Sequence, residues 1–112
     1  MQEAFERFDR ANAEDPNQEV VIGISQPKAL AYARRMTERL DRFSPKASEA
    51  LRLAVRCQHI RRWTIPRSEF PSGRIGYREW RTTLAAHHAE TAAAILRDVG
   101  YDDSTLSRVQ AL

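Results

Sequence analysis

The chain has 112 residues, of which 42% are hydrophobic and 29% charged, and its 18 lysines and arginines outnumber 15 acids. This composition fits one soluble domain and argues against a disordered chain. A single cysteine, Cys57, excludes an internal disulfide framework and a cysteine-rich zinc site. The longest apolar run, Val20–Ile24, is too short to cross a membrane, and the acidic N-terminus carries no secretion signal. We therefore expect a cytoplasmic protein without a membrane partner.

Hydrophobic spacing predicts an all-α fold, a compact bundle of four to five helices in a single domain over residues 1–112. The expected helices cover residues 2–14, 27–43, 45–62, 77–98 and 102 onward. Phe43 is expected on the buried face of the second helix and Leu112 on that of the last. Val20–Ile24 has the composition of a strand, but we find no second segment to pair with it. It is expected to lie extended on the core.

The third predicted helix is apolar on two sides, which is typical of a central helix in a bundle. Leu51 lies on one apolar side, and Leu53 lies on the other. Between the two sides, spacings of three and four residues place a polar stripe on one line, namely Glu49, Arg52, Arg56, His59 and Trp63. This stripe is either functional or a solvated edge.

A long Pro/Gly/Arg loop, residues 63–76, is expected between the third and fourth helices. It either binds an anion or serves as a lid whose apolar residues fill the core. On the fourth helix, His88 lies on the inward stripe, and Arg81 lies seven residues earlier on the same face. His88 is either a ligand or a hydrogen-bonded histidine of the core.

Positive charge is concentrated in residues 52–81, which hold eight arginines and two glutamates. Such a block favours a site for phosphate, a nucleotide or a nucleic acid, and the alternative is a solvated basic face. The candidate phosphate-binding residues are Arg52, Arg56, Arg62, Arg67, Arg74 and Arg81. Trp63, Tyr77 and Trp80 are candidate surfaces for stacking on a ligand.

His59 and His88 lie on two predicted helices and can meet at one metal ion or one phosphate. The sequence contains no glycine-rich phosphate loop, no G-x-S-x-G turn and no H-E-x-x-H pattern. Cys57 and His59 point about 200° apart on a helix, which argues against a catalytic pair. Both histidines are therefore candidates for a metal or phosphate site, and no catalytic residue is assigned.

Several segments resemble an uncharacterised family of bacterial and fungal proteins, domain of unknown function number 4202. They are Arg56–Trp63, Pro66-Arg67, Pro71, Arg74, Gly76-Tyr77, Trp80–Thr82, His88–Glu90 and Gly100–Asp103. The family looks distantly similar to the HD-type metal-dependent phosphohydrolases. That resemblance implies an HD-like helical fold, a divalent metal such as manganese, iron or zinc at His59 and His88, and arginines that neutralise a phosphate.

Members of this family look longer, so further C-terminal helices are expected that this chain lacks. Three hypotheses for function follow. The first is a metal-dependent phosphohydrolase-like protein that binds a nucleotide or another phosphorylated small molecule. The second is a non-catalytic module that binds an anion or RNA. The third is a truncated domain with an incomplete site, which forms a homodimer through an exposed apolar face.

Overall fold

The computed structural model describes the backbone of residues 1–112 and every side chain except that of Val21. Over these residues the chain forms five α-helices, two short 3₁₀ helices and a two-stranded antiparallel sheet. In chain order the elements are α1 (Gln2–Asn12), β1 (Gln18–Val21), β2 (Ile24–Pro27), α2 (Lys28–Phe43), α3 (Glu49–Cys57), η1 (Arg62–Thr64), η2 (Arg67–Glu69), α4 (Arg74–Val99) and α5 (Asp103–Ala111). The predicted mainly helical fold is confirmed.

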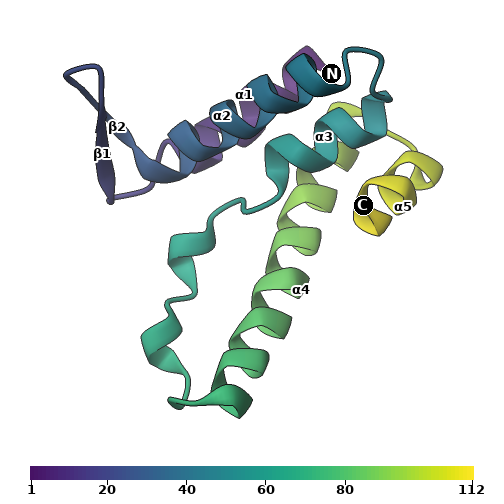
Figure 1. The fold of residues 1–112 in the computed structure, drawn as a ribbon. Coiled ribbons are helices and arrows are strands. Elements are labelled where there is room, and N and C mark those ends of the chain that lie inside the picture. Colours follow the sequence, from purple (N-terminus) through teal and green to yellow (C-terminus); the bar gives the residue numbers. More distant parts are fainter.

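Helices α1, α2 and α3 contact one another and form one group, and α4 and α5 join this group near α3 (Figure 1). Helices α1 and α2 lie side by side across the top of the molecule, and α3 packs against both of them. The long helix α4 contacts α1 at its C-terminal end, where α5 also packs, and its N-terminal half extends away from the other helices. The segment that holds the two 3₁₀ helices runs beside this extended half.

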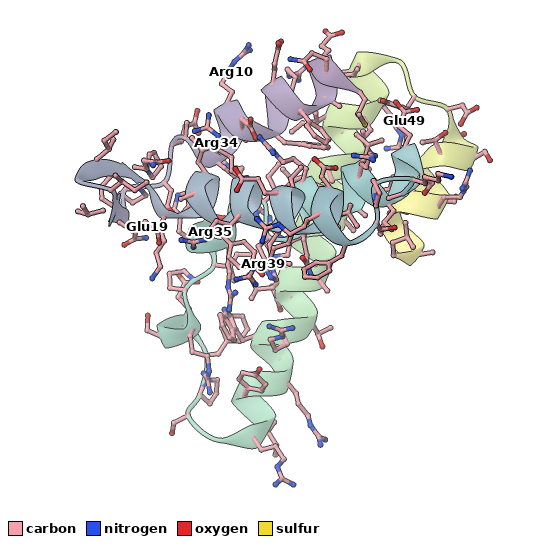
Figure 2. All side chains as sticks on the ribbon, turned by 45° about the horizontal axis from the view of Figure 1, so that its top comes forward. Arg10, Glu19, Arg34, Arg35, Arg39 and Glu49 are labelled. Carbon is pink, nitrogen blue, oxygen red and sulfur yellow. The ribbon has the colours of Figure 1, made fainter. Side chains whose placement is uncertain are left out.

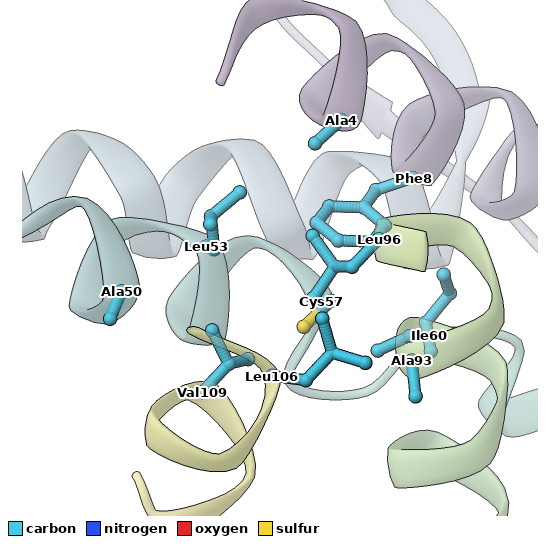
Figure 3. Packing of buried hydrophobic residues seen from close by; sticks show 11 residues of the cluster. Ala4, Phe8, Ala50, Leu53, Cys57, Ile60, Ala93, Leu96, Leu106 and Val109 are labelled. Carbon is cyan, nitrogen blue, oxygen red and sulfur yellow. The ribbon is translucent and has the colours of Figure 1, made fainter. Parts of the chain in front are cut away.

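The core lies where α1, α3, α4 and α5 converge (Figure 3). Phe8 of α1, Leu53 of α3 and Leu96 of α4 are at most 1% exposed, as is Ile60 from the turn after α3. Within α3 the buried residues are Ala50, Leu53 and Cys57, at spacings of three and four. The second apolar side of α3, which includes Leu51, is half-buried and borders a cavity described below.

The segment Val20–Ile24 is part of a β-hairpin, so the prediction of an unpaired segment on the core was wrong. Val20 pairs with Ser25, and the hairpin turns at Ile22 and Gly23. Both turn residues have positive φ, 51° and 75°, as a two-residue hairpin turn of type I′ requires. Val20 and Ile24 are 71% and 62% exposed, so these side chains do not cover the core.

Helix α3 is shorter than predicted, because it ends at Cys57 and the chain then turns through residues 58–61. Arg61 adopts left-handed backbone angles, with φ of 53°. The side-chain oxygen of buried Asn12 accepts a 3.1 Å hydrogen bond from the Arg61 backbone N–H. Asn12, at the end of α1, thus satisfies the backbone N–H of Arg61 in the turn that follows α3.

Residues 63–76 are more ordered than the predicted loop, since they include η2 and the first turn of α4. The guanidinium group of Arg67 donates hydrogen bonds of 2.9–3.3 Å to the carbonyls of Phe70, Pro71 and Gly73. Gly76 lies so close to Pro71 that a Cβ atom there would be 1.7 Å from the Pro71 carbonyl oxygen. This close approach fixes the return of the chain into α4.

Two residues predicted to face inward are exposed. Phe43, at the C-terminal end of α2, is 81% exposed, and Leu112, after the end of α5, is 66% exposed. Both predictions were wrong. Each residue continues the hydrophobic spacing of its helix, but each lies at a helix end outside the packed core, and Leu112 borders the half-open smaller cavity described below.

Replacing Asn12 by alanine should lower the free energy of unfolding by about 1–2 kcal/mol, because the partly buried Arg61 N–H loses its acceptor. Urea denaturation measures the difference. Ser107→Ala, on the exposed face of α5, is the control and should change the stability by less than about 0.5 kcal/mol. Equal stability of Asn12→Ala and the wild type would show that the turn does not depend on this bond.

Replacing Gly76 by alanine should cost about 3 kcal/mol, although alanine is the better helix former, because the new Cβ atom collides with backbone rather than with a flexible side chain. Thermal unfolding followed by circular dichroism is the measurement. Thr82→Ala, at an exposed position of the same helix, should be nearly neutral. A stabilised Gly76→Ala variant would contradict the close approach to Pro71.

Candidate functional site

Two histidines from different segments meet beside the core. His59 lies in the turn after α3, and His88 lies in the middle of α4, with 5.6 Å between their ring centroids. The Nδ1 atom of His88 is 2.8 Å from the carbonyl oxygen of Ile60, so Nδ1 carries the proton and donates it. Nε2 of His88 is then an acceptor, and it is buried without a hydrogen-bond partner among the described residues.

Both imidazoles are neutral near pH 7. Burial lowers the pKa of His88 to about 4, assisted by the nearby His59, His87 and Arg62 and opposed by the hydrogen bond to Ile60. Burial also lowers the pKa of His59, and two arginines, Arg62 among them, add to that effect. The pair is thus a set of uncharged hydrogen-bonding groups in a basic environment.

His59 borders a cavity of about 660 Å³ between α2, the end of α1 and the segment after α3. Its walls carry cations and aromatic rings together, in particular Lys28, Tyr32, Arg35, Arg56, Arg62, Trp63 and Trp80. Asn12, Asp15 and Asn17 add polar atoms. The ring of Tyr32 on α2 lies 5.2 Å from the ring of His59, so the histidine forms part of the cavity wall beside an aromatic surface.

The aromatic part of this cavity is held by hydrogen bonds and stacking. The indole N–H of Trp80 donates to the Ile65 carbonyl at 2.8 Å, which ties α4 to the segment after η1. The guanidinium carbon of Arg62 lies 5.2 Å from the Trp80 ring centroid, within the range of a cation–π contact. Trp63 lies on η1, next to Arg62. These contacts place one arginine and two indoles on the same wall.

The cations of the cavity differ in how far they are neutralised. Arg35 donates a 2.6 Å hydrogen bond to Glu19 of β1, and Figure 2 labels the two on neighbouring elements. Arg56 is paired with Asp9. Among the described side chains, no carboxylate forms an ion pair with Lys28 or Arg62. Lys28 and Arg62 are therefore the two cations of this cavity that are available to an anion.

On its other side, His59 borders a second cavity of about 350 Å³ between α3, α4 and α5. Its walls are mainly apolar and include Leu51, Ala54, Val55, Leu84, Ala85, Ala89, Ala92, Val109 and Leu112. Its charged and polar residues are His59, His88, Arg81, Gln58 and Gln110. His59 thus borders both the cationic, aromatic cavity and the mainly apolar one, whereas His88 borders only the latter.

Two predicted phosphate-binding arginines are engaged in contacts within the protein. Arg56 forms a bidentate salt bridge with Asp9, with hydrogen bonds of 2.8 and 2.7 Å, and the Arg56 side chain is only 11% exposed. Arg52 pairs with Asp41 and donates to two carbonyls of the connection before α3. Although Arg56 borders the larger cavity, its charge is neutralised, and Arg52 borders neither cavity.

The remaining predicted residues are dispersed. Arg67 holds the carbonyls of its own loop, and Arg74 is exposed in the first turn of α4. Neither borders either cavity. Tyr77 is 48% exposed and packs on Trp80, with 5.9 Å between the ring centroids, but it too lies outside both cavities. Of the predicted arginines, Arg62 and Arg81 border a cavity without an acidic partner among the described side chains.

Lys28, Tyr32 and Arg35 were not predicted as site residues. They lie on one face of α2 at spacings of four and three, and all three border the larger cavity. A helix face that mixes one aromatic ring with two cations was the signal available in the sequence. The eight arginines of residues 52–81 form the stronger charge signal in the sequence.

The residues described here do not fit the expected metal ion. They include no group of three or more His, Cys, Asp or Glu side chains that could hold one. His59 and His88 are two imidazoles without a carboxylate, and such sites between helices usually recruit carboxylates. Cys57 is buried, and burial raises the pKa of its thiol to about 12, so it offers no thiolate.

The neutral state of His88 makes the protein less stable in mild acid. The unfolded chain takes up a proton below the ordinary pKa of 6.5, whereas folded His88 does so only near 4, so stability falls as the pH drops through this range. Because the ring is only partly buried and solvent screens its charge, this one group should remove roughly 1–2 kcal/mol between pH 7 and pH 5. His88→Asn, which keeps a donor for Ile60, should lose that much less over the same interval in urea denaturation. An identical pH dependence of variant and wild type would contradict the assignment.

The comparisons with known proteins give one match. No helix in the described part of the chain is both long and apolar enough to span a membrane. No curated protein and no solved structure matches the chain. The family model described as Domain of unknown function (DUF4202) matches residues 2–112, and the chain therefore belongs to that family.

Proposed function

We propose that the protein binds a phosphorylated small molecule with an aromatic group, of which a nucleotide is the clearest class, in the larger cavity. The observation that carries this proposal is that unpaired cations and aromatic rings line the same cavity of about 660 Å³. That volume lies within the range typical of small-molecule sites. A cavity for a purely apolar ligand would have no use for the two cations, and a cavity for phosphate alone would not need three large rings.

The phosphate end of the proposed ligand lies between Lys28 and Arg62. Lys28 comes from α2 and Arg62 from the segment after α3, so their side chains would contact an anion from two walls of the cavity. The carboxylate of Asp15 also borders the cavity, but it already accepts hydrogen bonds of 2.9 Å from the backbone N–H groups of Asn17 and Ala29. These bonds reduce its repulsion of an incoming anion.

The aromatic end of the ligand is placed against Tyr32, Trp63 and Trp80. Stacking on an aromatic side chain contributes roughly 1–3 kcal/mol per base and accepts any base. The indole N–H of Trp80 is already occupied by Ile65, so this ring offers its surface rather than a hydrogen bond. The proposal therefore predicts selectivity for a phosphate joined to a ring, with little preference between bases.

His59 supplies a neutral hydrogen-bonding group between the two ends. In its neutral form the imidazole can accept a proton at pH 7, which general base catalysis requires. The proposal nevertheless concerns binding, because the described residues include no group of three or more His, Cys, Asp or Glu side chains that could hold a metal ion. Metal-assisted hydrolysis stays a prediction, and its test is metal content after incubation with manganese, iron or zinc.

Isothermal titration calorimetry with AMP, GMP, CMP and UMP tests the proposal. Adenosine and ribose 5-phosphate serve as fragments that each lack one end. The four nucleotides should bind with similar affinity, and each fragment should bind at least tenfold more weakly than AMP. Lys28→Gln and Arg62→Gln should each weaken AMP binding about tenfold, since each removes one charge-assisted contact. Lys46→Gln is the matched control, because Lys46 is exposed and borders neither cavity.

Three outcomes would contradict the proposal. AMP that fails to bind, or that binds no better than ribose 5-phosphate, would remove the role of the aromatic wall. An equal effect of Lys28→Gln and Lys46→Gln on AMP binding would show that the affinity depends on the net charge of the protein and not on the position of Lys28. Tight binding of single-stranded RNA with a steep loss of affinity in salt, without binding of mononucleotides, would favour the RNA-binding alternative instead.

A further inference from the structure

The smaller cavity is a narrow apolar trough along α4. Its residues on this helix run from Arg81 to Ala92, which are eleven residues apart and therefore roughly 16 Å along the axis. Alanines supply much of the α4 wall, while α3 and α5 close the other sides with Leu51, Val55 and Val109. The trough thus has a long apolar lining formed by three helices.

A cation lies at one end of this lining. Arg81 is the cavity residue nearest the N-terminal end of α4, it is exposed, and it forms no ion pair with a described carboxylate. His59 borders the same cavity and has no hydrogen-bond partner within the described chain, so one ring N–H is available as a donor. No acidic side chain borders the cavity. Arg81 is therefore the one charged side chain among the described residues that border this cavity, and its neutral polar neighbours there are His59, His88, Gln58 and Gln110.

The size of the trough limits what it can hold. The cavity has about 350 Å³, at the lower end of the range for small-molecule sites. Spread along roughly 16 Å of α4, this volume suits a ligand made of one narrow chain.

We propose that this cavity binds a single-chain amphipathic anion, a medium-chain fatty carboxylate, with its head group at Arg81 and its alkyl chain along α4 toward Ala92. The site is distinct from the nucleotide cavity, and the two share His59 on their common wall. Binding rests on burial of the alkyl chain, and the guanidinium sets the orientation and selects a negative head group.

Isothermal titration calorimetry with hexanoate, octanoate and decanoate, below the concentration at which micelles form, tests the site. Affinity should rise by up to about fourfold for each added methylene until the trough is full. Arg81→Gln should weaken decanoate binding about tenfold and leave decanol binding unchanged, since the alcohol carries no charge. Decyltrimethylammonium should bind at least tenfold more weakly than decanoate.

A second pair of variants examines the apolar wall. Ala89→Leu places three extra carbons inside the trough and should abolish decanoate binding. Ala94→Leu makes the same change at an exposed position of α4 that borders neither cavity, and it should bind decanoate normally. Circular dichroism of both variants keeps a loss of binding separate from a loss of folding.

The proposal is overturned if decanoate does not bind, if decyltrimethylammonium binds equally well, or if Ala89→Leu and Ala94→Leu behave alike. Sedimentation of the protein with phosphatidylglycerol vesicles, without binding of free decanoate, would assign the interaction to a lipid surface and would also overturn it. AMP binding to Arg81→Gln should equal that of the wild type, so failure of the fatty carboxylate site and failure of the nucleotide site are distinguishable.

Discussion

The turn at residues 58–61, with Ile60 buried at its centre, is the constraint on which the rest of the site depends. At its centre, the backbone of Ile60 and Arg61 is held by two side chains from other helices, since His88 donates to the Ile60 carbonyl and Asn12 accepts from the Arg61 N–H. These two bonds stabilise an early end to α3. Had α3 continued, His59 would lie on a helix face and the following segment would lead away from α4. Because α3 ends there, the chain turns toward α4 and places its next residues against the larger cavity.

The parts of the fold that depend on local sequence could be predicted. Asp102 accepts a 2.8 Å hydrogen bond from the Thr105 N–H at the start of α5, and Gly100 ends α4 with a φ of 106°, as their residue types indicate. The end of α3 could not be predicted, because the chain between Cys57 and Trp63 contains no glycine or proline and the stabilising partners are 28 and 49 residues away. The hairpin was missed for a local reason: Ile22 is a poor residue for a left-handed turn, so the pattern gave no turn signal.

The candidate site was predictable where it followed a helix stripe and unpredictable where charges pair across the fold. The inward position of His88 was readable from its neighbours on α4, and the structure brings His59 beside it. The basic block gave no indication of which arginines are free. Arg56 is engaged by Asp9, 47 residues away, and no spacing rule connects the two. The net charge of a segment therefore overstates the charge that it offers to a ligand.

The contacts between the 62–73 segment and α4 have a mechanical consequence. Trp80 holds Ile65, His87 lies 3.1 Å from the hydroxyl of Thr64, and the backbone of Pro71 packs directly on Gly76. The segment is thus fastened to α4 at three points along its length and cannot peel away as a flexible lid. A displacement of this wall of the larger cavity would therefore carry Trp63 and the N-terminal half of α4 together, whereas α2 on the opposite wall is not bound by these contacts.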